Sequence, residues 1–345
     1  MGAAVATAHR RGPWSDLLSH LHRLPPLAAR AHRAPGRQRK RRARHRHRPR
    51  RGTGLVTDTS TCDLLDRALV ARALTTSDHR TRLLWQSRPT SEIADRIRRG
   101  HTGFPTPSDL GDLARRDVDR LNELDARVVT RDDDEWPRSL SARLHRATQT
   151  SPFALYLRGP VRLDTIIEQT ITITGSRAAT GYGRTVTDRI AAELTTLGWP
   201  GVAGSAYGVA AIAHKAGLAA HGHPVAVLAA GIDVAHPPGH SGLLATIATI
   251  GLLVSEYPPG MSVTRARRRA QTRLLAALSR AVLIIESTPG GEPATIAAHA
   301  VRHRVPVFAL PGPVTSATTA LPHELIATGR ARLITSGHDI HHFMS

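Results

Sequence analysis

A regular alternation of short apolar segments with longer amphipathic ones, from Ile166 to the C-terminus, most constrains the fold of this chain. The short segments are bounded by Gly, Pro or Ser, as buried strands usually are. We expect strands at 170–174, 202–203, 225–228, 252–255, 282–286, 307–309 and 332–334. We expect helices at 183–197, 209–221, 241–250, 265–278, 293–303 and 322–328. The pattern predicts an α/β fold whose doubly wound, mostly parallel sheet binds ligands at the carboxyl ends of its strands.

The segments before this region divide in two. Residues 1–52 carry about +14 of the formal net charge of +20, so we expect a disordered basic tail. Either a nucleic-acid-binding arm or an unstructured extension fits that composition. Residues 53–125 have apolar positions at three- and four-residue steps, such as Leu65, Leu69 and Val70, and predict a small helical region. A short strand at 126–129 then opens the main domain, residues 126–345.

Composition narrows the class of protein further. A pI of about 11.6 favours a polyanionic partner, although most of the charge lies in the tail. The single cysteine, Cys62, excludes an internal disulfide framework and a multi-cysteine zinc site. No apolar run approaches the ~20 residues of a membrane span, and the N-terminus has no signal-peptide core, so we expect a cytoplasmic protein. With 3% aromatic residues, the chain cannot line a sheet or barrel with base-stacking rings.

Glycine-containing turns follow the first two expected strands. The first reads TGSRAATGYGR and the second AGSAYGVAAIAH, and both place small residues where a phosphate needs close backbone approach. We expect the two turns to form one shared cradle for an anion. Neither matches the dinucleotide fingerprint or a Walker A loop, so no cofactor is expected. The scattered histidines also lack the partners of a folded metal site.

Several ordered segments of this region resemble the DprA/Smf family of DNA-processing proteins over residues 126–340. They are ITITGSR, GSAYGVAAIAHKAGL, AVLAAGIDVAHPPGH, LLVSEYPPG, TRLLAALSRAVLIIES, VFALPGPVTS and ITSGHDI. The resemblance implies a Rossmann-like domain that binds and protects single-stranded DNA and passes it to the recombinase RecA. It also implies a homodimer that has no catalytic activity and does not bind a membrane. A winged-helix segment that often follows in the family is absent from the expected domain.

The resemblance also implies the residues that hold DNA. The matching positions are Gly175, Ser176 and Arg177 in the first turn, Gly204, Ser205, Ala206 and Gly208 in the second, and Arg273 in the segment TRLLAALS. Arg177 and Arg273 are expected to face one concavity and to bind phosphates, with the hydroxyls of Ser176 and Ser205 completing the anion site.

The chain departs from the family pattern in this pocket. Tyr207 and Ala210 stand where the family has an arginine and an aspartate, and Gln271 and Thr272 replace the first two residues of an R-N-R motif. Fewer cations predict weaker and less salt-dependent binding. Residues 267–269, including Arg269, either compensate or form a solvated helix start. Tyr207 either stacks on a base or packs over its turn with the hydroxyl in water.

An enzymatic alternative arises from the segment Pro289 to Gly291. It is similar to the PGG-x-GT loop of phosphoribohydrolases, which have a related fold, but the residues after it are out of register. On that alternative the chain cleaves a nucleoside monophosphate. Asp233, His236 and Glu256 follow expected strands and would suit acid–base catalysis. The other interpretation is that Asp233 caps a turn and Glu256 orients an arginine.

Overall fold

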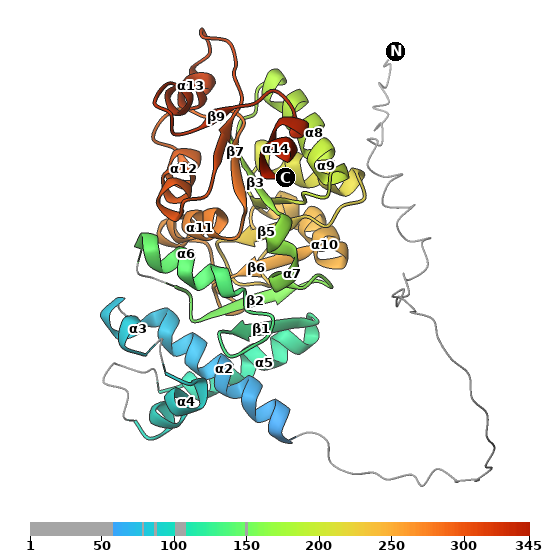
Figure 1. Cartoon of the computed structure of the whole chain (residues 1–345). Helices are drawn as coiled ribbons and strands as arrows, with labels where there is room; N and C mark the ends of the chain where they lie inside the picture. Colours follow the sequence, from blue (N-terminus) through green and yellow to red (C-terminus); the bar gives the residue numbers. More distant parts are fainter. Residues whose placement is uncertain (1–57, 78, 86–87, 101–107, 149–150) are drawn as a thin grey trace, which may run out of the picture. The chain divides into compact units, whose positions relative to one another are not determined.

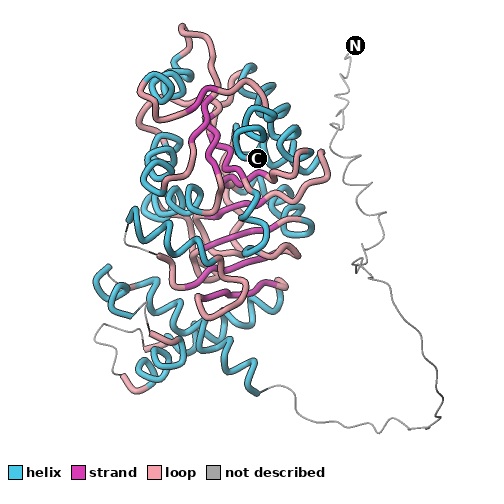
Figure 2. Tube along the Cα trace, in the orientation of Figure 1, coloured by secondary structure: helices cyan, strands magenta, loops and turns pink. Residues whose placement is uncertain are grey.

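The computed structural model describes residues 58–77, 79–85, 88–100, 108–148 and 151–345. The tail expected at residues 1–52 lies outside these described residues. Leu55–Ser345 form one compact unit, in which a central sheet has helices on both faces (Figures 1 and 2). None of the helices in these described ranges has both the length and the apolar character that a membrane span requires.

The sheet has nine strands in the order β1-β2-β6-β5-β4-β3-β7-β8-β9. Neighbours from β6 through β9 in this order pair in parallel, whereas β1 and β2 extend the sheet antiparallel beyond β6. The predicted α/β, mostly parallel sheet is therefore confirmed. The strands are β1 (Ala126–Thr130), β2 (Ala154–Arg158), β3 (Ile171–Thr174), β4 (Gly201–Gly204), β5 (Val225–Leu228), β6 (Leu252–Ser255), β7 (Ala281–Ile284), β8 (Val307–Ala309) and β9 (Arg332–Leu333).

Several helices precede the parallel strands, and those that end by Glu123 fall in the predicted helical region. They are α2 (Asp58–Thr76), α3 (His79–Trp85), α4 (Thr90–Arg98), α5 (Leu110–Glu123), α6 (Arg138–Thr148) and the short α7 (Leu163–Ile166). The helices that alternate with parallel strands are α8 (Gly181–Thr196), α9 (Val209–Ala219), α10 (Ser241–Ile250), α11 (Arg265–Ala277), α12 (Glu292–His303) and α13 (Ala320–Ala327), and α14 (Gly337–Met344) follows β9.

The core has a layer on each side of the sheet because successive strand residues point to opposite faces. In β7, Val282 and Ile284 pack in the cluster that includes Leu275 of α11 and Ile296 of α12. Leu283 packs on the other side, with residues of α8, α9 and α14. Strands buried on both faces read as continuous apolar runs, which is why the sequence locates them well.

The helical region packs against the antiparallel end of the sheet. Ala71 of α2 and Leu121 of α5 share an apolar cluster with Val128 of β1. Arg72 of α2 forms an ion pair with Asp117 of α5 and donates a hydrogen bond to the Pro259 carbonyl oxygen at 3.0 Å. The boundary at residue 125 stays a prediction, since these contacts join both sides of it.

The order of the sheet reverses at β3. The chain proceeds from β3 through β4 and β5 to β6 on one side, and then returns to place β7, β8 and β9 on the other side. Open α/β sheets bind ligands outside the carboxyl ends of strands near such a reversal. The two predicted glycine turns leave β3 and β4 at this end of the sheet.

Candidate nucleic-acid interface

The glycine turns after β3 and β4 are joined through their backbones. The Val209 amide donates to the Ser176 carbonyl oxygen at 3.0 Å, and the Ser176 amide donates to the Glu286 carbonyl oxygen at 2.7 Å. Gly208 has a φ of 75°, and a Cβ there would collide with the Ser176 carbonyl oxygen. Only glycine suits this position, because it needs both a positive φ and close backbone approach. The structure thus brings the two turns side by side, as expected.

The N-terminus of α8 is occupied by a carboxylate from the chain itself. Glu286, which is fully buried after β7, accepts hydrogen bonds from the Thr180 amide at 2.8 Å and the Thr180 hydroxyl at 2.7 Å. A Cβ at Gly183 would meet this carboxylate, so Glu286 lies directly against the first helical turn. A helix N-terminus attracts anions. Because Glu286 already supplies one, the α8 start does not present the open anion site that the sequence suggested.

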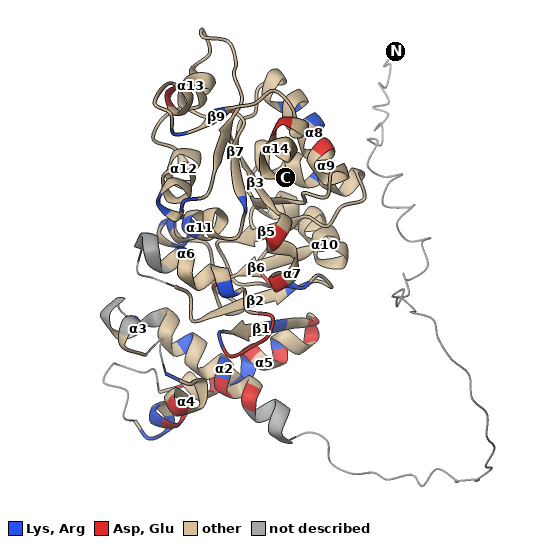
Figure 3. Ribbon diagram, in the orientation of Figure 1, with Lys and Arg blue, Asp and Glu red and all other residues tan. Residues whose placement is uncertain are grey.

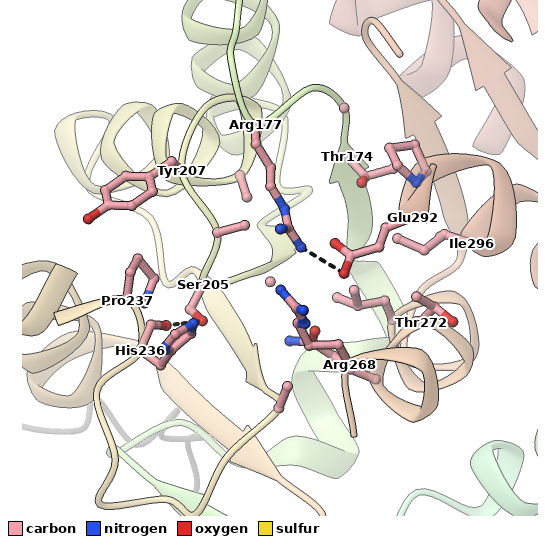
Figure 4. A pocket seen from close by; sticks show the side chains of 18 of the residues that line it. Thr174, Arg177, Ser205, Tyr207, His236, Pro237, Arg268, Thr272, Glu292 and Ile296 are labelled. Carbon is pink, nitrogen blue, oxygen red and sulfur yellow. Dashed lines mark hydrogen bonds and ion pairs between the residues drawn. The ribbon is translucent and has the colours of Figure 1, made fainter. Parts of the chain in front are cut away.

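An open pocket lies beside the glycine turns, at the carboxyl ends of β3, β4 and β5 (Figure 4). Its volume is about 340 Å³, within the range of small-ligand sites. The start of α12 and one face of α11 form its other walls. The lining residues are Thr174, Gly175, Arg177, Gly204, Ser205, Ala206, Tyr207, Ala210, Ala229, His236, Pro237, Val263, Arg268, Gln271, Thr272, Leu275, Glu292, Pro293 and Ile296.

Two guanidinium groups enter this pocket. Arg177, from the first turn, lies 2.8 Å from the Glu292 carboxylate, and its side chain is 51% exposed. Arg268 of α11 extends toward it across the pocket (Figure 4) and has no carboxylate partner among the described residues. Figure 3 marks the basic positions of α11, a helix with no acidic residue in its first turn. Because the helix dipole disfavours cations at this end, these arginines reduce helix stability and favour an anionic ligand nearby.

Arg273 does not line the pocket, so the expectation that it faces the same concavity as Arg177 is wrong. Its guanidinium forms hydrogen bonds at 2.6 and 2.8 Å to both oxygens of Glu256, and the two side chains are only 11% and 8% exposed. Burial lowers the pKa of Arg273, but the charge and hydrogen bonds of Glu256 outweigh that effect and raise it. The interpretation of Glu256 as a residue that orients an arginine is confirmed. Arg269, the other predicted cation of α11, is exposed outside the pocket lining.

The predicted serine hydroxyls are already used as donors. The Ser176 hydroxyl donates to the Ala178 carbonyl oxygen at 3.1 Å, and the Ser205 hydroxyl donates to the His236 carbonyl oxygen at 2.5 Å. Their protons therefore stabilise the loops. Gly175, Gly204, Ser205 and Ala206 line the pocket, whereas Ser176 and Gly208 support it from behind.

Tyr207 presents the exposed ring of the pocket. It is 52% exposed and contacts the His240 ring edge-on, with 4.4 Å between ring centroids. His240 in turn donates from Nδ1 to the Ser205 carbonyl oxygen at 2.8 Å. The ring is thus held at its edge while one part stays open to a ligand, and an exposed ring of this kind is suited to stacking on a base.

A buried histidine supports the second turn from below. His214 of α9 is 1% exposed, and its Nε2 donates to the Gly204 carbonyl oxygen at 3.1 Å. Burial, which disfavours the charged imidazolium, lowers the pKa of His214 to about 4. The imidazole is consequently neutral at pH 7 and fixes the carbonyl of a pocket-lining glycine.

Of the three acid–base candidates of the enzymatic alternative, Asp233 and Glu256 are engaged outside the pocket, whereas His236 lines it. Asp233 accepts a hydrogen bond from the Gly260 amide at 2.8 Å and lies 3.5 Å from Arg120, so it joins its own loop to a second loop and to α5. Glu256 forms an ion pair with Arg273. The backbone carbonyl oxygen of His236 accepts a hydrogen bond from the Ser205 hydroxyl. Across the described ranges, no group of three or more His, Cys, Asp or Glu side chains is arranged to hold a metal ion.

Sequence reasoning missed two charged residues that line the pocket. Arg268 stands in the sequence as one of a run at 267–269, and its helical spacing from Gln271 and Thr272 is the signal that singles it out. Glu292 stands directly after the mismatched PGG motif. Its position at the start of α12, after β7, was the available signal.

Comparisons with known proteins find relatives over more than half of the chain. The family described as DNA recombination-mediator protein A matches residues 127–345. The chain is 40% identical over 266 residues to a Mycobacterium tuberculosis protein that carries the name DNA processing protein DprA, covering 73% of this chain and 68% of that protein. It is 34% identical over 198 residues to the protein Smf of Escherichia coli, covering 56% of this chain and 51% of Smf.

Solved structures show the same fold. The X-ray structure of DprA from Streptococcus pneumoniae has a TM-score of 0.61 and 23% identity, covering 81% of this chain and 95% of that one. A Helicobacter pylori DNA processing protein A, described in its single-stranded DNA binding mode, has a TM-score of 0.56 and 24% identity, covering 64% of this chain and 95% of that one.

Proposed function

Because this chain belongs to the DNA recombination-mediator protein A (DprA/Smf) family, we propose that it binds single-stranded DNA in the pocket at the carboxyl ends of β3, β4 and β5. The observation that carries the proposal is that Arg177, Arg268 and the exposed Tyr207 all line one pocket beside two glycine turns. Guanidinium groups suit phosphates, and a ring face binds any base. The expected contact is therefore tolerant of sequence. The Helicobacter pylori relative is described as a single-stranded DNA binder.

The first experiment measures the affinity of the full chain for a labelled thymidine 20-mer by fluorescence anisotropy at several salt concentrations. Arg177→Ala removes one charged contact, so we expect roughly tenfold weaker binding at low salt. The slope of log Kd against log salt should flatten by about 0.7, the value for one phosphate of a single strand. Arg280→Ala is the matched control. Arg280 is 42% exposed, has a carboxylate neighbour in Glu168, and precedes β7 at the opposite end of the sheet. Equal losses in both variants would remove the pocket assignment.

We further propose that the bound strand is protected and passed to RecA by a homodimer, as the family resemblance implies. Nuclease digestion of the oligonucleotide with and without the protein measures protection, and sedimentation velocity measures the dimer. Co-sedimentation with RecA measures the partner. A monomer that neither protects the strand nor binds RecA would limit the protein to strand binding.

We propose that the protein acts without catalysis. Support comes from the ion pair that engages Glu256 and from the loop contacts that engage Asp233, which leave neither carboxylate placed for proton transfer in the pocket. Incubation with a panel of nucleoside monophosphates, followed by chromatography, should release no free base. Release of base that is lost in Arg177→Ala would favour the phosphoribohydrolase alternative.

A further inference from the structure

A carboxylate stands among the cations of the proposed DNA pocket. Among the described residues that line the pocket, Glu292 is the only acidic one, and it lies 2.8 Å from Arg177. A phosphate that binds Arg177 must therefore compete with a negative charge that the chain itself supplies. Figure 4 draws the contact between Arg177 and Glu292 as a dashed line in the pocket.

The position of Glu292 does not depend on Arg177. Glu292 is the first residue of α12. It follows the N-cap residue Gly291 and precedes Pro293 in the first helical turn. A carboxylate in the first turn is stabilised by the helix dipole. The negative charge therefore remains at the pocket wall when Arg177 turns away to another anion.

The two ion pairs near the pocket differ in how readily they exchange. Arg177 and Glu292 are 51% and 38% exposed and share one close contact, so water and salt weaken their attraction. Arg273 and Glu256 are 11% and 8% exposed and are joined by two hydrogen bonds. Only the first pair can be displaced by a ligand at small cost.

We propose that Glu292 is a built-in competitor for the DNA phosphate on Arg177 and thereby sets the affinity and salt dependence of the pocket. This inference rests on the proposed function. In the free protein Arg177 is neutralised by Glu292. In the complex Arg177 contacts a phosphodiester, while Glu292 remains near the strand and repels it.

The test is the same anisotropy titration with Glu292→Gln, which keeps the shape of the side chain and removes its charge. We expect three- to tenfold tighter binding at 50 mM NaCl and a steeper salt slope, because no freed carboxylate takes up a counterion when the strand binds Arg177. Glu324→Gln is the matched control because Glu324 is 46% exposed and pairs with Arg330 at 2.6 Å, outside the pocket. It should leave both values unchanged.

Combination with Arg177→Ala isolates the pair. In that background Glu292→Gln should tighten binding by less than it does in the wild-type protein, because only the repulsion between Glu292 and the strand is left to remove. Unchanged or weaker binding by Glu292→Gln, with the wild-type protein binding normally, would overturn the inference and leave the proposed function standing. If neither protein binds the strand at the lowest salt, the proposed function fails and the inference fails with it.

Discussion

Arg177 and Arg273, to which the family resemblance gives the same role, have different environments in the structure. Arg177 is half exposed in a pocket, whereas Arg273 is buried against Glu256. Family resemblance assigned both to DNA because a sequence does not show which face of a helix a residue occupies in its tertiary setting. Arg177 lies in the turn after β3 and lines the pocket. Within α11, Arg268, Thr272 and Leu275 also line the pocket, whereas Arg273 does not.

Replacement of the buried arginine should reduce stability. Arg273→Met leaves Glu256 buried and unpaired, and we expect a loss of about 3–5 kcal/mol in the free energy of unfolding. Arg177→Ala breaks an exposed pair and should cost less than about 1 kcal/mol. Urea denaturation followed by tryptophan fluorescence measures both. The double variant Arg273→Met/Glu256→Leu should recover much of the loss, and full stability of Arg273→Met alone would contradict this assignment.

Acidic pH should lower the stability of the folded protein through His214, the buried residue that supports the turn after β4. The pKa of His214 is about 4 in the folded protein, below the value of about 6.5 in an unfolded chain, so the unfolded state binds more protons between these values. Stability therefore falls as the pH falls from about 6.5 toward 4. Between pH 7 and pH 5 we expect His214 to account for about 2 kcal/mol of the decrease. The decrease should be smaller by that amount in His214→Gln, and an identical decrease would disprove it.

At the scale of the element, α11 combines a structural face with a binding face. Its N-cap residue Thr264 accepts from the Arg267 amide, and Arg267 lies over the Tyr257 ring and donates to the Ser262 carbonyl oxygen. Buried residues Leu274 and Leu275 hold the helix in the core. The helix start is thus fixed, and Arg268 is positioned by it without an ion pair of its own among the described residues.

Adjacent arginines of α11 provide an internal comparison. Arg268→Ala removes a side chain that lines the pocket, whereas Arg269→Ala removes an exposed one that does not. We expect about fivefold to tenfold weaker binding of the oligonucleotide for the first and less than twofold for the second, because a direct charged contact exceeds a screened distant one. Anisotropy at 100 mM NaCl measures both. A larger effect of Arg269→Ala would place the strand on the outer face of α11.

At the scale of the whole molecule, the sequence predicted the parallel sheet well. Every expected parallel strand and helix from 170 to 334 is present, with ends shifted by a few residues. The apolar runs are buried on both faces, so local pattern and tertiary setting agree. The antiparallel β2 and the helices α6 and α14 were not predicted. The residues 154–158 read as a lead-in segment, and their pairing with β6 is a long-range contact that periodicity does not encode.

The site was less predictable than the fold. Sequence located the glycine turns and Arg177, since turn chemistry is local. It did not locate Glu286, whose carboxylate reaches the start of α8 across 106 residues of chain, or the pairing of Arg177 with Glu292 across 115. Such contacts depend on strand order, which the sequence leaves open.

Coupling between the helical region and the sheet should appear in unfolding. Arg72→Ala leaves Asp117, which is 2% exposed, without its ion-pair partner and removes the bond to Pro259. We expect a loss of about 3 kcal/mol or more. Because the two regions share an apolar cluster, circular dichroism and fluorescence should report one common transition at a lower denaturant midpoint. Two separated transitions would show instead that the regions unfold independently.

Glu286 makes the first turn of α8 independent of any bound anion. In many sheets of this architecture a nucleotide phosphate lies against the equivalent helix start, whereas here a carboxylate of the polypeptide itself holds it. This helix end should therefore keep one conformation whether the neighbouring pocket is empty or filled.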